Sequence, residues 1–200
     1  MGEMGNVVMA ELQYLGLIWD RLRSMADGSA PSAAIQLATV SSTGSPSLRT
    51  VILREANFDE ATISFITDIR STKVGDVRRD PRVSAISYDL ESRVQIKLVG
   101  TAAVVDEEAA RQAMWQRLRP HTREEFEREL PPGILLHPDS GNAMGWEYDG
   151  DAPKERYDRY ALVAISVASA EWLDVSGKEH VRFAFYRDRR PKWRAVRLSP

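Results

Sequence analysis

The stretch IQLATVSSTGSPSLRTVILR, residues 35–54, carries the strongest fold signal in the chain. Two runs rich in apolar and β-branched residues flank a segment in which Ser, Gly and Pro are concentrated. β-branched residues favour strands, whereas Gly and Pro favour tight turns. The pattern therefore predicts two strands joined by a hairpin turn.

Strand patterns continue along the chain on both sides of a short helix. ATISFIT (61–67), RVSAISYDL (82–90) and RVQIKLVGTAAVV (93–105) read as strands, and residues 71–79 read as a helix that ends at Asp80-Pro81. Three further strands are predicted at 159–175, 180–188 and 193–200, the last two joined by a tight turn at 189–191. Roughly eight strands linked by hairpin turns predict a mainly β fold, an antiparallel barrel that is closed or nearly closed.

Helical patterns lie outside this β framework. Residues 6–27 have apolar residues at helical spacing, and residues 107–130 continue helically from an acidic start. Residues 131–159 are rich in Pro, Gly and Asp without periodicity, which predicts a long loop and a candidate lid. We predict one domain over residues 1–200, with an N-terminal helix 6–27, a barrel core at about 33–106, a helical insert 107–130, a loop 131–159 and C-terminal strands 160–200.

The composition excludes several classes of function. The chain has 200 residues, 43% hydrophobic and 28% charged, and its net charge of −2 gives no reason to expect nucleic acid or an anionic membrane as partner. It has no cysteine, which excludes disulfides, thiolate metal sites and a cysteine nucleophile. No apolar run is long enough to span a membrane. We expect a cytoplasmic protein.

The stretch FITDIRSTK, residues 65–73, predicts a strand that turns into the first turn of a helix. Helix N-termini carry unsatisfied N–H groups and partial positive charge, and here Ser71 and Thr72 add hydroxyls while Lys73 adds a full charge. Such a combination suits a phosphate. The alternative is an ordinary helix in which Ser71 is the N-cap and Lys73 is solvated.

Two arginines in SLRTVILR form a second candidate site. Strand alternation places Arg49 on one face and Arg54 on the other, each among apolar neighbours, where a half-buried guanidinium requires an anionic partner. Edge positions or local salt bridges are equally compatible with the pattern. Gln95 lies in the strand predicted at 93–105, and its side-chain amide can donate and accept hydrogen bonds with the polar edge of a heterocycle. The alternative is that Gln95 lies on a solvated outer face.

The segment EWLDVSGKEHVRF brings further polar residues together near the C-terminus. Trp172 and Arg182 flank a turn that carries Lys178 and His180. Taken alone, Trp172 could be a core or lid aromatic residue. Taken alone, His180 could have a structural role. The three histidines have no metal-ligand spacing, and neither a nucleophile motif nor a glycine-rich phosphate loop is present, so we expect no metal.

Taken together, these segments resemble the pyridoxamine 5'-phosphate oxidase family of FMN-binding split barrels. The resemblance runs from about Ile35 to the C-terminus and is strongest over 37–105. It implies an antiparallel split β-barrel with peripheral helices, a homodimer and an FMN site at the dimer interface. The residues it implies for FMN are Arg49, Thr50, Val51, Ile52, Leu53, Arg54, Ile66, Thr67, Ser71, Thr72, Lys73, Gln95, Trp172 and Arg182.

The substrate side departs from the family pattern. The resemblance implies Trp115, Arg119 and Arg123 as counterparts of a Tyr, an Arg and a Ser, and only Arg119 matches. Lys178 and His180 stand where the family has Arg-x-His and are the candidate catalytic residues. The implied activity is hydride transfer from a small substrate to flavin N5. The alternatives are a carrier or sensor that binds FMN or another flat cofactor without turnover, and a structural dimer without ligand.

Overall fold

The computed structural model describes residues 2–141, 144, 155–188 and 192–200, with side chains from residue 12 onward. The tight turn predicted at 189–191 and most of the predicted loop after residue 141 therefore lie outside the described residues. None of the helices within these described residues is both long and apolar enough to cross a membrane.

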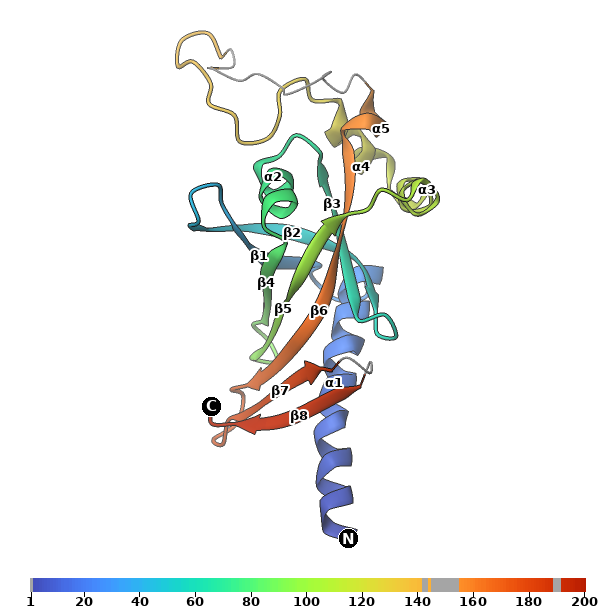
Figure 1. Ribbon diagram of the computed structural model, residues 1–200, viewed down its shortest axis with the longest axis vertical. Helices are drawn as coiled ribbons and strands as arrows, with labels where there is room; N and C mark the ends of the chain where they lie inside the picture. The colour runs from blue at the N-terminus through green and yellow to red at the C-terminus, as the bar shows by residue number, and fades with distance from the viewer. Residues whose placement is uncertain (1, 142–143, 145–154, 189–191) are drawn as a thin grey trace.

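Eight antiparallel strands form one sheet that closes into a barrel (Figure 1). The order is β3-β2-β1-β4-β5-β6-β7-β8, and pairing of β3 with β6 closes the first six strands, while β7 and β8 extend the sheet beyond the barrel. The strands are β1 Ala34–Val40, β2 Pro46–Asn57, β3 Thr62–Asp68, β4 Arg82–Asp89, β5 Val94–Val104, β6 Tyr160–Asp174, β7 Val181–Arg187 and β8 Trp193–Leu198. The predicted split β-barrel is confirmed.

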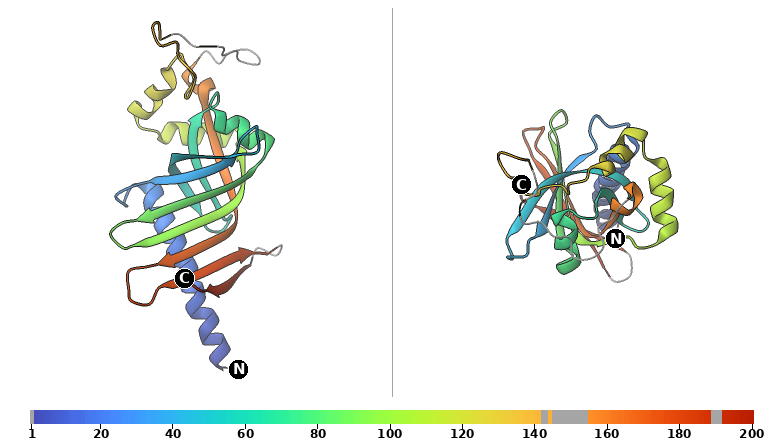
Figure 2. Two further views of the ribbon diagram at one scale, coloured as in Figure 1. Left: turned by 90° about the vertical axis from the view of Figure 1, so that its left-hand side faces the viewer. Right: turned by 90° about the horizontal axis from the view of Figure 1, so that it is seen from above.

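The helices lie outside the barrel (Figures 1 and 2). Helix α1, Gly2–Asp27, packs along the barrel and buries Ile18, Trp19 and Leu22 against it. Helix α2, Thr72–Arg79, follows β3. Helices α3, Glu108–Arg117, and α4, Pro120–Glu124, the 3₁₀ turn η1, Glu125–Glu127, and the single turn α5, Arg156–Arg159, gather at one end.

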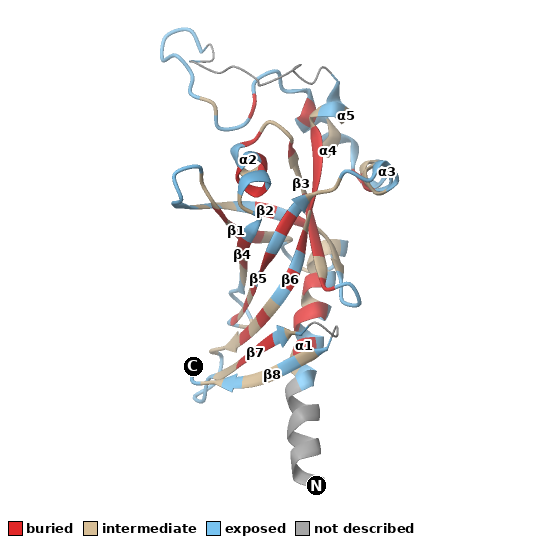
Figure 3. Ribbon diagram, in the orientation of Figure 1, coloured by how far each residue is buried: buried red, intermediate tan, exposed pale blue. Residues whose placement is uncertain are grey.

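The barrel core follows the alternation expected of strands. Val94, Ile96 and Leu98 of β5 are buried, whereas their neighbours on the outer face are partly or fully exposed. Buried residues follow the length of β5 and β6 in Figure 3, and α3 is mainly exposed. A second, smaller apolar cluster of Met114, Leu118, Phe126, Tyr160 and Leu162 holds the helices to the end of β6.

The prediction that residues 107–130 are continuously helical is wrong. The chain is extended at Leu118 and Arg119, with ψ of 138° and 149°, between α3 and α4. Pro120 causes this break, because the proline ring disfavours helical geometry in the residue before it. The break allows α4 and η1 to turn back toward the barrel.

Candidate functional site

A cavity of about 620 Å³ lies where β2, β3 and the start of α2 meet. The barrel side of this cavity is formed by neighbouring strands and by the first turn of α2. The opposite wall comes from the segment after α4. The lining residues include Thr50, Val51, Ile52 and Arg54 of β2, Ile66, Thr67 and Asp68 of β3, Lys73 of α2, and Phe126, Leu130, Pro131, Ile134 and Leu136 of the opposite wall.

The end of the cavity near α2 carries a cluster of hydroxyl and cationic groups. Lys73 Nζ donates a hydrogen bond of 2.9 Å to Thr67 Oγ1, and Ser71 Oγ lies 3.3 Å from the same oxygen. The N-terminal N–H groups of α2, an eight-residue helix, lie beside them. Free N–H groups, hydroxyls and an ammonium at one point are the donors that a phosphate group requires.

Electrostatics make this end of the cavity receptive to an anion. Burial lowers the pKa of the Lys73 ammonium, and the nearby charge of Arg49 lowers it further, although Asp68 and Asp76 act in the opposite direction. Burial also lowers the pKa of the Arg49 guanidinium. Two like charges held half-buried and close together are relieved by a bound anion.

Arg49 is held by a hydrogen-bond network in its predicted strand position. Its guanidinium donates to Thr39 Oγ1 at 2.6 Å and to Ser47 Oγ at 2.6 Å, and lies 3.4 Å from Asp76 Oδ2. Asp76 is buried and also accepts a hydrogen bond of 2.7 Å from Thr39. This network fixes the orientation of Arg49, while Asp76 neutralises only part of its charge.

Ser71 occupies the N-cap position of α2 but makes no side-chain capping hydrogen bond. Its hydroxyl is buried and directed toward Thr67 instead. Thr72, the first residue of the helix, is exposed. Ser71 is therefore the N-cap residue of α2, but its hydroxyl contacts Thr67 and makes no capping hydrogen bond.

The predicted stretch from Thr50 to Arg54 divides between cavity and core. Thr50, Val51 and Ile52 line the cavity, whereas Leu53 is buried in the barrel core and its N–H is bonded to Ala33. A β-bulge then shifts the register of β2 on β3 between Leu53 and Glu55. Bulges redirect side chains, and here Glu55 turns out of the core, while Arg54 lines the cavity with Thr50 and Ile52.

Arg54 and Arg119 form a pair of like charges beside the cavity. The pKa of Arg54 is lowered by burial and further by the charge of Arg119 at the start of α4. Arg54 Nε is buried and has no hydrogen-bond partner, and neither guanidinium has an ion-pair partner among the described residues. Burying a guanidinium without an anionic partner costs free energy. The region around Arg54 is therefore a second place in the site where a bound anion would be stabilised.

None of the three predicted substrate-side residues, Trp115, Arg119 and Arg123, lines this cavity. The ring of Trp115 packs in an aromatic cluster with Phe126 and Tyr160, at centroid distances of 5.7 and 5.2 Å. Arg123 lies over the Trp115 ring, and its guanidinium donates to the carbonyls of Trp115 and Gln116 at 3.0 and 2.7 Å. Arg123 therefore caps the end of α3 and has few donors left for a ligand.

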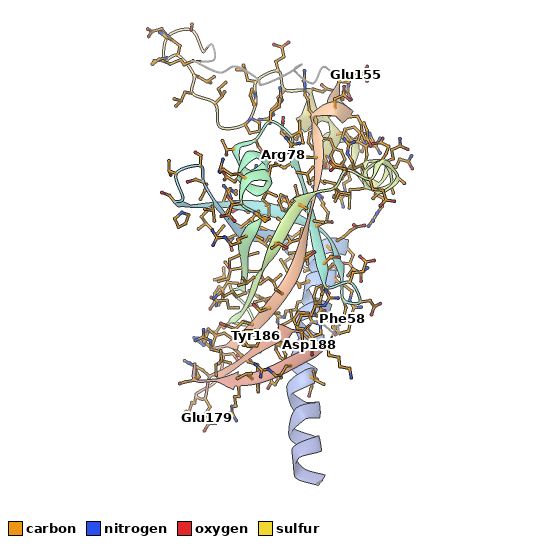
Figure 4. The ribbon with its side chains drawn as sticks, in the orientation of Figure 1. Phe58, Arg78, Glu155, Glu179, Tyr186 and Asp188 are labelled. Carbon is orange, nitrogen blue, oxygen red and sulfur yellow. The ribbon has the colours of Figure 1, made fainter. Side chains whose placement is uncertain are left out.

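The remaining predicted residues lie at the other end of the barrel. Figure 4 labels Arg78 of α2 and Glu179 of the β6–β7 turn, and the two are far apart along the long axis. Lys178 and His180 flank Glu179 and are exposed. Trp172 is buried against Tyr14, and Arg182 is bonded to Glu171 at 2.9 Å. Within one chain, this group and the cationic end of the cavity do not meet.

Gln95 lies on the outer face of the sheet in one row with Leu173 and Arg182, and so belongs with this second group. It is half-buried, pairs with Tyr88 of β4 and Leu173 of β6, and does not line the cavity of one chain. The outer face around it also exposes large apolar side chains, namely Leu48, Ile52, Tyr88 and Val99. Exposed apolar patches of this kind mark interaction surfaces.

Sequence reasoning missed two sets of residues at this site. Asp76 and Thr39, which hold Arg49, gave no motif, although Asp76 lies three residues after Lys73 and so on the same side of the helix. The apolar wall at 130–136 was predicted only as loop. No group of three or more potential metal-ligating side chains occurs in the described part of the chain.

Comparison with known proteins connects this geometry to a family. The model of the FMN-binding domain of pyridoxamine 5'-phosphate oxidase matches residues 17–106. A pyridoxine/pyridoxamine 5'-phosphate oxidase of Crocosphaera subtropica is 37% identical over 87 residues, which cover 44% of this chain and only 39% of that relative. The enzyme of the same name from Cupriavidus pinatubonensis is 27% identical over 172 residues, covering 84% of this chain and 79% of the relative.

A solved structure shows the same fold. The pyridoxamine 5'-phosphate oxidase-related, FMN-binding protein of Nostoc punctiforme superimposes with a TM-score of 0.72 at 23% identity, over 94% of this chain and 96% of that one. The matched family segment, residues 17–106, includes Arg49, Thr67, Lys73 and Gln95.

Proposed function

We propose that the chain, whose residues 17–106 match the FMN-binding domain of the pyridoxamine 5'-phosphate oxidase family, is a member of that family and an FMN-dependent oxidoreductase. The observation that carries the proposal is the cationic end of the cavity, where Lys73, Thr67 and Ser71 meet the start of α2 near Arg49. FMN ends in a phosphate, and this cluster supplies charge and donors that a phosphate needs.

The chain's own residues divide the work of holding FMN. Lys73, Ser71, Thr72 and the N–H groups of α2 bind the phosphate, and Arg49, oriented by Thr39 and Asp76, adds charge. Thr50, Val51 and Ile52, with Ile66 and Thr67, form the surface against which the flavin lies. When bound, FMN supplies a hydride acceptor at N5, and the protein supplies orientation and electrostatics.

The substrate that this site favours carries a negative charge. Arg54 and Arg119 offer two unpaired guanidiniums next to the flavin surface. The apolar side chains of Phe126, Ile134 and Leu136 on the opposite wall suit a flat, partly apolar body and exclude water from it. Pyridoxine and pyridoxamine 5'-phosphate, named in the relatives, are the first substrates to test.

We further propose that the working unit is a homodimer in the cytoplasm. None of Gln95, Trp172, Arg182, Lys178 and His180 lines the cavity that holds the cationic end, and the turn between β6 and β7 lies at the opposite end of the molecule (Figure 1). A second copy packed on the apolar outer face around Ile52 would supply them. In that arrangement Gln95 and Arg182 complete the FMN site from the sheet surface, Trp172 supports them from the core, and Lys178 and His180 face the substrate.

A second candidate function is binding of FMN, or of another flat cofactor, without turnover. One observation favours it: Trp115 and Arg123, the counterparts of substrate-binding residues, are engaged in packing and in capping α3. A carrier or sensor would need the cofactor surface and no complete substrate site.

The test is to purify the protein, record its visible spectrum, and release and identify any chromophore. Bound FMN, or FMN taken up in titration, supports both candidate functions, whereas a colourless protein that does not bind FMN contradicts both. Anaerobic reduction of the bound flavin by pyridoxine 5'-phosphate, pyridoxamine 5'-phosphate or another planar anionic reductant then separates the oxidoreductase from the carrier.

A further inference from the structure

A buried ion pair lies directly beside the cationic end of the cavity. Arg70, between β3 and α2, forms a two-pronged contact with Asp68, with Nε–Oδ1 at 3.0 Å and a second nitrogen–Oδ2 distance of 2.7 Å. The side chains are only 2% and 8% exposed. Isolated charges at such depth are costly, so the two groups depend on each other.

The outer edge of the Arg70 guanidinium binds a different part of the chain. It donates to the backbone carbonyls of Glu129 and Arg128 at 2.7 and 2.9 Å, where η1 has just ended. Arg159 donates to the carbonyls of Glu127 and Arg128 at 2.8 and 3.1 Å. These carbonyls lack helical partners, because they follow the last turn of η1.

A backbone hydrogen bond closes this arrangement. The N–H of Ile69 donates to the carbonyl of Arg159 at 2.7 Å, so the β3–α2 turn, the end of η1 and the end of α5 are held in one place. We call Asp68, Arg70 and the carbonyls of Arg128 and Glu129 the clasp. The chain that leaves the clasp, residues 130–136, is the apolar wall of the cavity, and Asp68 lines the same cavity.

We propose that Arg70 is a positioning residue that holds residues 130–136 as a wall over the flavin and substrate. This inference rests on the proposed function for its ligand, while the clasp itself is a property of the protein alone. The Arg70 guanidinium donates to Asp68 and to two carbonyls, so it is not available to bind the phosphate. Its role is to join the phosphate end of the cavity to the wall that covers the substrate.

The rival explanation is that the clasp only stabilises the fold. A single Arg70 variant cannot separate the two, because it would leave Asp68 buried and unpaired. The double variant Asp68→Asn with Arg70→Gln removes both charges together. Asp80 and Arg82, also two residues apart, form the same kind of two-pronged contact on the surface, with Nε–Oδ1 at 2.9 Å and Nη2–Oδ2 at 2.6 Å. Asp80→Asn with Arg82→Gln is therefore a matched control.

The first measurement is amide hydrogen exchange on the full chain without added ligand. We expect exchange of the Met144 N–H, which donates to the carbonyl of Leu135 in this wall at 2.8 Å, to rise at least tenfold in the clasp variant, while exchange in β1, β4 and β5 and in the control variant stays at wild-type rates. Unchanged exchange at Met144 overturns the proposal. An equal rise throughout the barrel strands also overturns it, because the clasp would then stabilise the whole fold.

The second measurement uses FMN as the probe. In the clasp variant, in which Lys73, Thr67 and Ser71 remain to bind FMN, quenching of the bound flavin's fluorescence by acrylamide rises at least twofold. Wild-type quenching in the clasp variant contradicts the assignment of 130–136 as the flavin's cover. Failure of the wild-type protein to bind FMN refutes the proposed function instead, and the exchange result still decides the role of Arg70.

Discussion

Replacing Lys73 by Met tests the phosphate site most directly. Met keeps much of the length and apolar character of the lysine stem but removes the ammonium that lies 2.9 Å from Thr67 Oγ1. A hydrogen bond to a charged group contributes about 1.5–3 kcal/mol. That free energy corresponds to a rise of roughly 10- to 150-fold in the dissociation constant for FMN.

When no ligand is bound, the same substitution should make the folded protein more stable. The pKa of folded Lys73 lies below its ordinary value, mainly through burial, so the unfolded chain binds more protons between the two pKa values. The free energy of unfolding therefore rises with pH across that interval, and at neutral pH the charged lysine costs stability. We expect Lys73→Met without FMN to unfold at a higher temperature than wild type, and to gain less from added FMN.

Isothermal titration and fluorescence quenching with FMN measure the affinity, and calorimetric unfolding measures the stability. Lys192→Met is the control, because Lys192 is exposed next to β8, far from the cavity. FMN affinity should also fall as pH rises through the Lys73 pKa in wild type, and this dependence should be absent in Lys73→Met. Equal FMN affinity of wild type and Lys73→Met would refute the phosphate role of Lys73.

Three further substitutions test other parts of the structure. Gly100→Ala should lower the free energy of unfolding by about 3 kcal/mol in denaturant melts, since the added methyl carbon would lie 2.0 Å from the carbonyl oxygen of Ser166. Tyr160→Phe should leave stability unchanged or raise it, because the Tyr160 hydroxyl is buried without a partner among the described residues. Replacing Lys178 and His180 together by Ala should slow reduction of the flavin in stopped-flow measurements and leave FMN bound; an unchanged rate would exclude both from catalysis.

The strand pattern predicted the barrel because alternation and hairpin turns are local properties. Bulges are not visible in that pattern. A period of two predicts that Glu55 follows Val51 and Leu53 into the core, yet Ala56 packs there, and Arg54 and Glu55 both lie outside it. The extra residue in β2 thus turns Glu55 out of the core, while Arg54 stays on the same face as Thr50 and Ile52. The alternation rule had placed Arg54 on the correct face without showing why its side chain reaches Arg119.

The candidate site was predictable where the residues that contact one another are close together in the sequence. Thr67, Ser71 and Lys73 lie within seven residues, and their grouping follows from one strand-to-helix turn. The wall at 130–136 was not predictable, because it is placed by Arg70 through contacts 58 and 59 residues away. Long-range backbone contacts of this kind leave no periodic signal in the sequence.

A complementation experiment tests whether the site is shared between two chains. Lys73→Met, in α2, damages the cationic end, and Arg182→Ala, in β7, damages the group that we assign to the partner's site (Figure 1). In a symmetric dimer with shared sites, a mixed dimer of the two variants has one site with both defects and one with neither. After subunit exchange at equal concentrations, about a quarter of all sites should therefore bind FMN with wild-type affinity. If each chain instead forms its own complete site, every site in the mixture carries one defect, and titration detects no wild-type sites.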